Sequence, residues 1–246
     1  MGTKSAAGLL TSVDSMFTTQ EERDNAQRSY LTDLPTAEIS DFPNHPFKVR
    51  MDESMTELAD SVKERGILSP VLVRPMPDGG YQMVSGHRRK MAAELARLPT
   101  VPCIVRELTD DEAIILMVDS NLQRDQVLPS EKAFAYKMKL DAMKRQAGRP
   151  SKNNSATVLQ NFDGKTSREL LAEQSGESHE QIRKYIRLTD LIPELLDMVD
   201  NSVLKEKDKL QMALRPAVEL SYLTESEQNA LLVSAAATCR PVPRAW

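Results

Sequence analysis

The clearest chemical pattern in the chain is a pair of helix-start signals separated by a glycine. Thr166 and Glu169 have the spacing of a helix-capping box, and Ser178 and Gln181 repeat that spacing. Gly176, between the two signals, can adopt a positive φ without steric cost. Two short helices around such a turn predict a helix-turn-helix, and the second helix of that motif usually enters the major groove of DNA.

The second predicted helix has one apolar face, formed by Ile182, Tyr185 and Ile186, which we expect to face the core. Its other face carries cations and hydrogen-bond donors that could contact bases and phosphates. An ordinary pair of packed helices with a solvated basic edge would explain the same pattern. The outward residues on this face are Ser178, His179, Glu180, Arg183, Lys184 and Arg187.

The distribution of charge favours DNA binding, although the 246-residue chain has a net charge of −4. Residues 137–168 hold eight basic side chains against two acidic ones, and this basic stripe leads into the predicted helix-turn-helix. Such a stripe is typical of a phosphate-binding surface. For residues 146–162 alone, a solvated linker explains the charge equally well. The predicted DNA-binding residues are Thr166, Ser167, Ser178, His179, Gln181, Arg183, Lys184 and Arg187, with Arg145 and Arg149 from the stripe.

A second motif with chemical meaning lies at residues 85–89, where a strand pattern meets a helix pattern. Gly86 lets backbone amides approach an anion closely, and the new helix N-terminus adds unpaired N–H groups. Arg88 and Arg89 oppose the helix dipole there unless an anion binds, so they predict a phosphate site. The open alternative is that the two arginines pair with nearby acids, such as Glu94 or Asp125.

Two further segments could face the same ligand. Residues 66–70 offer backbone groups, and residues 121–125 offer amide and guanidinium donors, although the latter also fit a helix end and linker. The chain has no GxxxxGK[ST] sequence and no recognisable nucleophile–base–acid triad. Its three histidines match no zinc spacing.

Alternation and helical periodicity predict two domains and two tails. Residues 34–125 combine strands with helices, whereas residues 126–232 are helical throughout and include the helix-turn-helix at 166–188. The tails are a flexible segment over 1–33 and a short one over 233–246. The predicted strands are 37–42, 70–74, 81–84 and 101–106, and the main predicted helices are 52–65, 87–97, 109–118 and 130–146.

The composition is that of a soluble globular protein, with 40% hydrophobic and 28% charged residues. No apolar run is long enough to span a membrane, and the first twenty residues lack a signal-peptide pattern. Two cysteines without metal-ligand spacing favour a reducing cytoplasm. We therefore expect no membrane partner and a cytoplasmic location.

Five stretches of sequence, in this order, resemble the ParB family of DNA-partition proteins. They are SMTELADSVKERGILSPVLVRP (54–75), GYQMVSGHRRKMAAELA (80–96), VPCIVRELTDDEA (101–113), SNLQRDQVLPSEKAFAY (120–136) and the helix-turn-helix. The resemblance runs from about Leu34 to Leu231. It implies an α+β N-terminal domain of the ParB and sulfiredoxin-like fold, followed by an all-α helix-turn-helix domain.

The resemblance also implies a function. Family members form homodimers that bind a palindromic, centromere-like DNA site, and they bind CTP with Mg²⁺, hydrolyse it slowly and close into a clamp. Their usual motor partner is a ParA-type ATPase, and the implied location is the bacterial cytoplasm, in association with a nucleoid or plasmid. The implied nucleotide-binding residues are Gly66, Ser69, Pro70, Ser85, Gly86, His87, Arg88, Arg89, Asn121 and Arg124, with Asn121 also as the implied metal ligand.

The sequence departs from the family pattern at two of these positions and at Ser120, which precedes Asn121. His87 replaces a glutamate and Ser69 replaces a glutamine. Ser120 replaces the glutamate that helps to hold magnesium in the family, and Asp119 is one residue away, which rotates a helical side chain by about 100°. We therefore expect nucleotide binding, whereas hydrolysis stays open.

Other interpretations remain. Family members normally end in a dimerising domain, and about fifteen residues follow Leu231, so the product is truncated or dimerises through its other domains. A ParB-like transcriptional regulator that does not spread on DNA is an alternative function. An enzyme of the sulfiredoxin kind is a third class, but Cys103 lies outside the residue 85–89 motif and is expected in the core.

Overall fold

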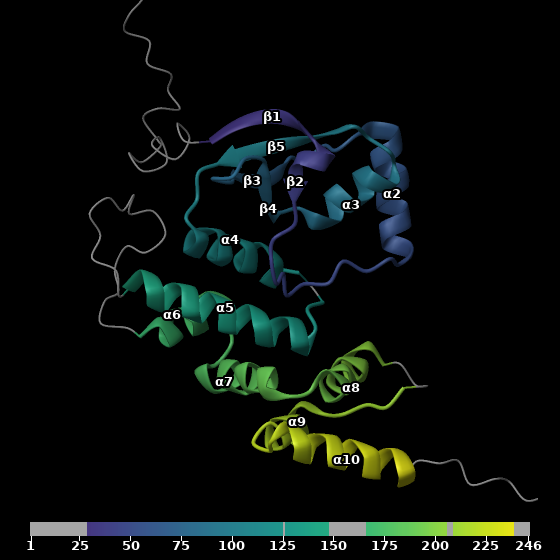
Figure 1. Ribbon diagram of the computed structural model, residues 1–246, viewed down its shortest axis with the longest axis vertical. Coiled ribbons are helices and arrows are strands. Elements are labelled where there is room, and N and C mark those ends of the chain that lie inside the picture. The colour runs from purple at the N-terminus through teal and green to yellow at the C-terminus, as the bar shows by residue number, and fades with distance from the viewer. Residues whose placement is uncertain (1–28, 125, 148–165, 206–208, 239–246) are drawn as a thin grey trace, which may run out of the picture. The chain divides into compact units, whose positions relative to one another are not determined.

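The computed structural model describes residues 29–124, 126–147, 166–205 and 209–238 (Figure 1). Contacts along the chain divide it into two compact units. The described part of the first is residues 29–41 and 51–109, and that of the second is residues 42–50 and 110–238 with the gaps given above. The sequence predicts a domain boundary near residue 125, and this boundary stays a proposal. The contacts divide the chain between residues 109 and 110, so they group residues 110–124 with the helices that follow.

The first unit is built on a mixed sheet. Among the described residues this sheet has five strands in the order β1-β5-β3-β4-β2. β5 pairs with β1 in antiparallel and with β3 in parallel, and β4 pairs with β3 in antiparallel and with β2 in parallel. The bounds are β1 Ser29–Pro35, β2 Ile39–Ser40, β3 Val71–Pro75, β4 Tyr81–Ser85 and β5 Thr100–Arg106.

Two helices complete the described part of this unit. α3 (His87–Leu95) packs against β3 and β5, and α2 (Glu53–Arg65) packs against α3 (Figure 1). α2 begins where Asp52 accepts a hydrogen bond from the Met55 amide, and it ends at Gly66, whose φ of 71° favours glycine. The sheet-side core consists of small and branched apolar side chains that are fully buried, including Val71, Val73, Met83, Val101 and Cys103.

The N-terminal part of the fold corrects two predictions. The flexible tail predicted over 1–33 is wrong for residues 29–33, because they belong to β1, which pairs with β5 along its whole length. Residues 1–28 lie outside the described residues. The strand predicted over 37–42 is only Ile39–Ser40, preceded by a 3₁₀ turn, η3 (Thr36–Glu38).

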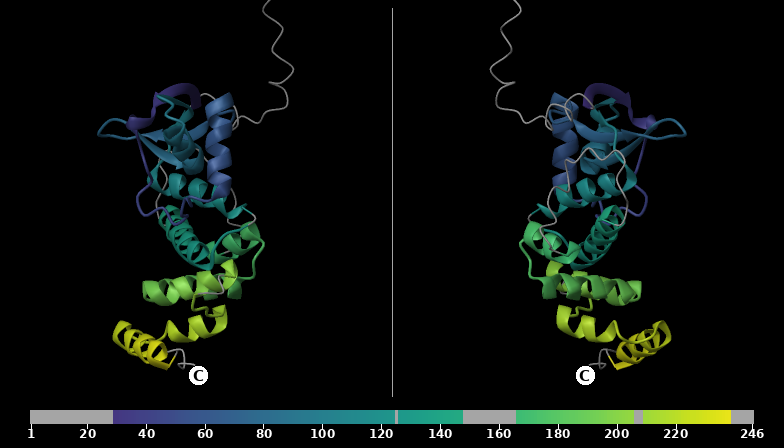
Figure 2. Two further views of the ribbon diagram at one scale, coloured as in Figure 1. Left: turned by 90° about the vertical axis from the view of Figure 1, so that its right-hand side faces the viewer. Right: turned by 90° about the vertical axis from the view of Figure 1, so that its left-hand side faces the viewer.

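The second unit is helical, as the sequence predicts, apart from the irregular segment 42–50 and the loops between the helices. Its longest described helix, α5, packs against α4, α6, α7 and α8 (Figures 1 and 2). Buried apolar residues from α5, α8 and α9 form a hydrophobic core cluster in this unit. The bounds are α4 Asp110–Leu122, α5 Pro129–Ala147, α6 Ser167–Ser175, α7 His179–Arg187, η4 Leu188–Asp190, α8 Pro193–Leu204, α9 Leu214–Leu220 and α10 Glu225–Thr238.

The helix-turn-helix geometry agrees with both start signals. Thr166 caps α6 and shares a full capping box with Glu169. Gly176 ends α6 with φ of 69°, and the Ser178 hydroxyl accepts a hydrogen bond from the Gln181 amide at 3.1 Å to begin α7. Ile182 is the buried anchor of α7, and Tyr185 packs at the edge of the core cluster. No described helix is long and apolar enough to cross a membrane.

Candidate nucleic-acid and nucleotide sites

The exposed face of α7 carries the residues that could contact DNA. Ser178, His179 and Arg183 are exposed, and Lys184 is partly exposed. Lys184 pairs with Glu180 one turn earlier at 2.9 Å, and this hydrogen bond lowers the pKa of Glu180 below its usual value. An exposed lysine–glutamate pair of this kind contributes little to stability, so Lys184 is available to a phosphate or base.

Arg187, predicted to face outward, is engaged within the second unit. Its Nη2 donates to the Ser221 carbonyl oxygen at 3.0 Å, and its Nη1 pairs with Asp190 at 2.9 Å. The guanidinium also lies over the Tyr222 ring, with 4.2 Å between Cζ and the ring centroid. These contacts tie the end of α7 to the end of α9, and they give Arg187 the geometry of a positioning residue.

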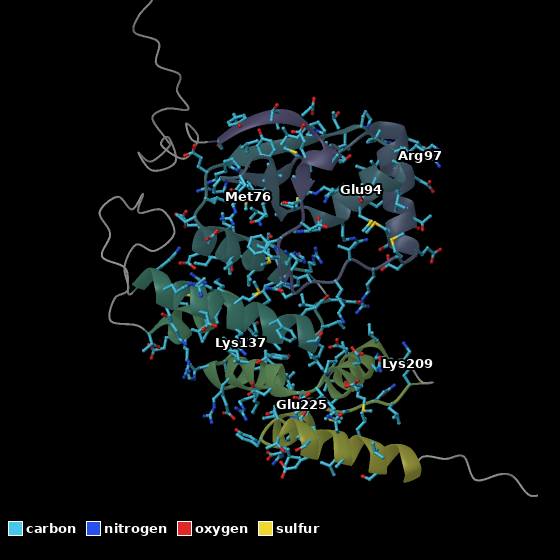
Figure 3. The ribbon with its side chains drawn as sticks, in the orientation of Figure 1. Met76, Glu94, Arg97, Lys137, Lys209 and Glu225 are labelled. Atoms are coloured by element: carbon cyan, nitrogen blue, oxygen red, sulfur yellow. The ribbon has the colours of Figure 1, made fainter. Side chains whose placement is uncertain are left out.

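The basic stripe is also partly used inside the protein. Lys139 is wrongly assigned to a phosphate-binding surface, because its side chain is 1% exposed and its ammonium pairs with Asp119. Arg145 is exposed but forms an ion pair with Asp111 at 2.7 Å. Lys137, labelled in Figure 3, donates to Thr189 at 3.1 Å. Arg149, Lys152 and Lys165 lie outside the described residues.

The bend at Gly86 has the geometry of an anion-binding turn. Gly86 has φ of 110° and caps the N-terminus of α3. A Cβ atom at this position would lie 2.7 Å from Cγ1 of Val71 and 3.2 Å from Nη2 of Arg89. Glycine is therefore required both by the backbone and by the close packing of β3. The first amides of α3, which have no acceptor within the helix, project from this turn.

The two arginines of the bend have different surroundings. Nη1 of Arg89 donates to the carbonyl oxygens of Ser69 at 2.7 Å and Pro70 at 2.6 Å, and burial lowers the pKa of this guanidinium. Arg88 donates from Nη2 to the Ser54 hydroxyl at 2.7 Å. Within the described residues neither arginine forms an ion pair, and Glu94 instead pairs with Lys90 (Glu94 is labelled in Figure 3).

The contacts of Arg89 join two segments that the sequence predicts at one ligand. Residues 66–70 and 85–89 lie together in the first unit because Arg89 bridges them. The exposed side of this junction holds Arg88 and the start of α3. Asp52 lies beyond Ser54, and the hydrogen bond that it accepts from the Ser54 hydroxyl, with the nearby charge of Arg88, lowers its pKa.

The third predicted segment lies on α4 and belongs to the second unit. The Asn121 side chain is buried, and its Nδ2 donates to the Met117 carbonyl oxygen at 2.7 Å. The Ser120 hydroxyl donates to the same carbonyl oxygen at 3.0 Å. Asp119 pairs with Lys139. Arg124 is exposed, and its guanidinium lies 5.9 Å from the centroid of the Phe47 ring.

These contacts test whether α4 suits a magnesium ion. Mg²⁺ requires oxygen ligands in near-ideal octahedral geometry, usually one or two carboxylates among them. Ser120 offers no carboxylate, and the carboxylate of Asp119 is bound to an ammonium. No group of three or more metal-ligating side chains occurs in the part of the chain that the structure describes. The described residues of α4 therefore do not fit the predicted magnesium site.

Cys103 has the surroundings of a core residue. It is fully buried in β5, and its thiol donates to the Val101 carbonyl oxygen at 3.1 Å. Burial raises the pKa of this thiol to about 11, so it is almost entirely protonated near neutral pH. This environment opposes a reactive thiolate.

Sequence reasoning missed the partners that fix these groups. Each of three key side chains has a partner that is distant in sequence: Arg88 contacts Ser54, Lys139 contacts Asp119, and Arg187 contacts Tyr222. The one local signal for any of these partners is the helix cap at Asp52, because it places the Ser54 hydroxyl at the start of α2.

Comparisons with known proteins identify the family. The ParB N-terminal domain family matches residues 20–122. The chromosome-partitioning protein Spo0J of Thermus thermophilus is 34% identical over 208 residues, which are 84% of this chain and 69% of that protein. The chain therefore belongs to the ParB family. For several other ParB proteins, the match spans only 34–43% of their length.

Two solved structures extend the comparison. The C2221 form of a pNOB8-like ParB N-domain covers 87% of this chain and 86% of its own, with a TM-score of 0.50 and 16% identity, which indicates a shared fold. A C-terminally truncated ParB from Caulobacter crescentus, complexed with CTP-γ-S, covers 83% of this chain and 98% of its own, with a TM-score of 0.37 and 26% identity.

Proposed function

We propose that this chain is a DNA-binding partition protein whose helix-turn-helix holds a palindromic site. Its membership of the ParB family and its resemblance to a Thermus protein with a chromosome-partitioning function support this proposal. The observation that carries the DNA-binding part is α7, a capped helix with one buried anchor and an exposed face of donors and cations. A homodimer matches a two-fold DNA site, and a ParA-type ATPase is the expected motor partner.

The proposed DNA contacts come from two helix starts. At α7, Ser178 and the adjacent amides suit a phosphate, while Arg183 and Lys184 are long enough to contact base edges. At α6, Thr166 and Ser167 offer hydroxyls beside unpaired helix amides. The remaining proposed contacts are His179 and Gln181 on α7, Arg145 on α5 and Arg149, whereas Arg187 is proposed only to position α7.

The first unit is proposed to bind the phosphates of CTP at the Gly86 bend. The amides at the start of α3 and the guanidinium of Arg88 are suitable donors, because both favour negative charge and the Arg88 guanidinium donates to a neutral hydroxyl. Arg89 contributes by fixing the bend to residues 66–70. The full proposed set in this unit is Gly66, Ser69, Pro70, Ser85, Gly86, His87, Arg88 and Arg89, and the family resemblance adds Asn121 and Arg124.

A protection footprint on DNA that flanks the gene, with and without CTP, tests this function. We expect a short protected palindrome without CTP and a changed pattern when CTP is added. Arg183→Ala should remove the protection, whereas the wild-type chain retains it at the same concentration. Protection of random DNA at equal concentrations would contradict sequence-specific binding, and a pattern that ignores CTP would contradict the nucleotide switch.

A second candidate function is a ParB-like regulator that binds its site without spreading. The observation that favours it is the poor fit of α4 to magnesium, because a nucleotide-driven clamp in this family depends on that region by resemblance. Chromatin immunoprecipitation separates the two functions. A signal that extends over kilobases supports a partition protein, and a narrow peak supports the regulator.

A further inference from the structure

We propose that this chain binds its nucleotide without a magnesium ion held by the protein, because the α4 residues that the family resemblance assigns to the metal offer only neutral oxygens and the carboxylate next to them is paired with Lys139. This inference rests on the proposed nucleotide-binding function and concerns which groups neutralise the phosphate charge. Its evidence is the set of contacts around residues 119–121 and the exposed donors at the Gly86 bend.

Ser120 and Asn121 are both turned toward their own helix. The Ser120 hydroxyl and the Asn121 amide group donate to the same Met117 carbonyl oxygen, at 3.0 and 2.7 Å. Their remaining acceptor atoms are a neutral hydroxyl and a neutral amide oxygen, and Asn121 is only 3% exposed. Neutral ligands alone are a poor site for Mg²⁺, which keeps its water shell unless carboxylates or phosphates replace part of it.

Asp119 is the nearest carboxylate to this position on α4, and its partner makes it costly to recruit. The Lys139 side chain is 1% exposed, and its ammonium contacts the Asp119 carboxylate and Oε1 of Gln174, the latter at 2.7 Å. Moving Asp119 to a metal would leave a buried ammonium with one neutral partner. Breaking such a pair lowers affinity for the competing ligand by a factor of about 100 or more.

The charge of the phosphates must then be met by donors of the protein. Arg88 is partly exposed and its guanidinium donates to the Ser54 hydroxyl, and the amides that begin α3 add the positive end of the helix dipole. Arg89 is the second guanidinium at the bend, although its Nη1 is occupied by two carbonyl oxygens. Arg88 is therefore the residue on which metal-independent binding depends most.

Titration of the full-length chain with CTP, in buffer with Mg²⁺ and in buffer with EDTA, tests the inference by isothermal calorimetry. We expect dissociation constants that agree within about threefold, because the protein supplies no ligand to the metal. Arg88→Ala should weaken binding by about tenfold or more in both buffers, as expected for loss of a charge-assisted hydrogen bond to phosphate.

A gain-of-function variant sharpens the test. Ser120→Glu supplies the missing carboxylate and should bind CTP about tenfold more tightly with Mg²⁺ than with EDTA. Gln126→Glu, at an exposed position beyond the motif, is the matched control for added charge and should show no such difference. If the wild-type chain bound CTP tenfold more weakly in EDTA than with Mg²⁺, the inference would be overturned but the proposed nucleotide-binding function would stand. Failure to bind CTP in either buffer, with DNA binding intact, would refute the proposed nucleotide function and the inference with it.

Discussion

Asp119→Asn tests how much the Lys139–Asp119 ion pair contributes to the stability of the second unit. The lysine of the Lys139–Asp119 pair is 1% exposed, whereas the aspartate is 42% exposed. Removing the carboxylate leaves the buried ammonium with the neutral side chain of Gln174 as its remaining partner among the described residues, and should lower the free energy of unfolding by about 3–5 kcal/mol. Lys139→Met should be much milder, at about 1 kcal/mol, because the freed carboxylate is accessible to water and the methionine keeps the buried volume.

Urea unfolding followed by circular dichroism measures this asymmetry. The loss expected for Asp119→Asn shifts the midpoint by about 1 M urea or more, given a denaturant slope of roughly 1–3 kcal/mol per molar. Asp141→Asn is the matched control, because Asp141 pairs with Lys144 at 3.7 Å and both side chains are about half exposed, so its loss should stay within about 0.5 kcal/mol. The double variant Asp119→Asn, Lys139→Met should recover most of the stability. Equal losses for Asp119→Asn and Asp141→Asn would refute the reasoning.

Three further predictions concern the bend, α7 and the buried thiol. Gly86→Ala should lower the free energy of unfolding by about 2–4 kcal/mol, because it adds a clash with Val71 to a strained φ. The control is Gly79→Ala, which has a φ of 93° but no neighbouring atom near the added Cβ. It should lower the free energy of unfolding by only about 1–2 kcal/mol in the same urea assay. Arg183→Ala should weaken specific DNA binding by about 1–3 kcal/mol without changing stability, whereas Arg187→Ala should lower both, as measured by gel shift and urea unfolding. Burial raises the pKa of the Cys103 thiol from 9.0 to about 11, so the unfolded chain loses this proton at a lower pH than the folded chain. The free energy of unfolding should therefore fall between pH 9 and 11, by about 1 kcal/mol at pH 10. Cys103→Ala should abolish this decrease.

The elements whose signals are local could be predicted from the sequence. The starts of α6 and α7 depend on capping side chains, the ends of α2 and α6 depend on glycines, and the structure places all four as predicted. The strand-to-helix bend at Gly86 is equally local, because its glycine, strand and helix are consecutive. Such signals act before any tertiary contact forms, so they need no knowledge of the fold.

The features that depend on distant partners could not be predicted. The apolar residues of β1 do not alternate with polar ones as in a typical strand, and its strand form depends on pairing with β5, about seventy residues later in the chain. Lys139 has the spacing of a basic surface residue, yet Asp119 and Gln174 make its burial possible. In each case the sequence carries the residue type, but the partner that decides its environment comes from another element.

The position of α5 explains why charge was the least reliable guide to the candidate site. A lysine on the longest described helix can contact DNA only if it faces solvent, but α5 is surrounded by α4, α6, α7 and α8. Its lysines and arginine therefore reach the helices around them: Lys132 pairs with Glu177 in the helix-turn-helix turn, Lys137 donates to Thr189, and Arg145 pairs with Asp111 on α4. The contacts of Lys132 and Lys137 join α5 to the helix-turn-helix turn and to η4, whereas the contact of Arg145 joins it to α4. We therefore expect base-specific contacts to come from the exposed face of α7, which packs against α5.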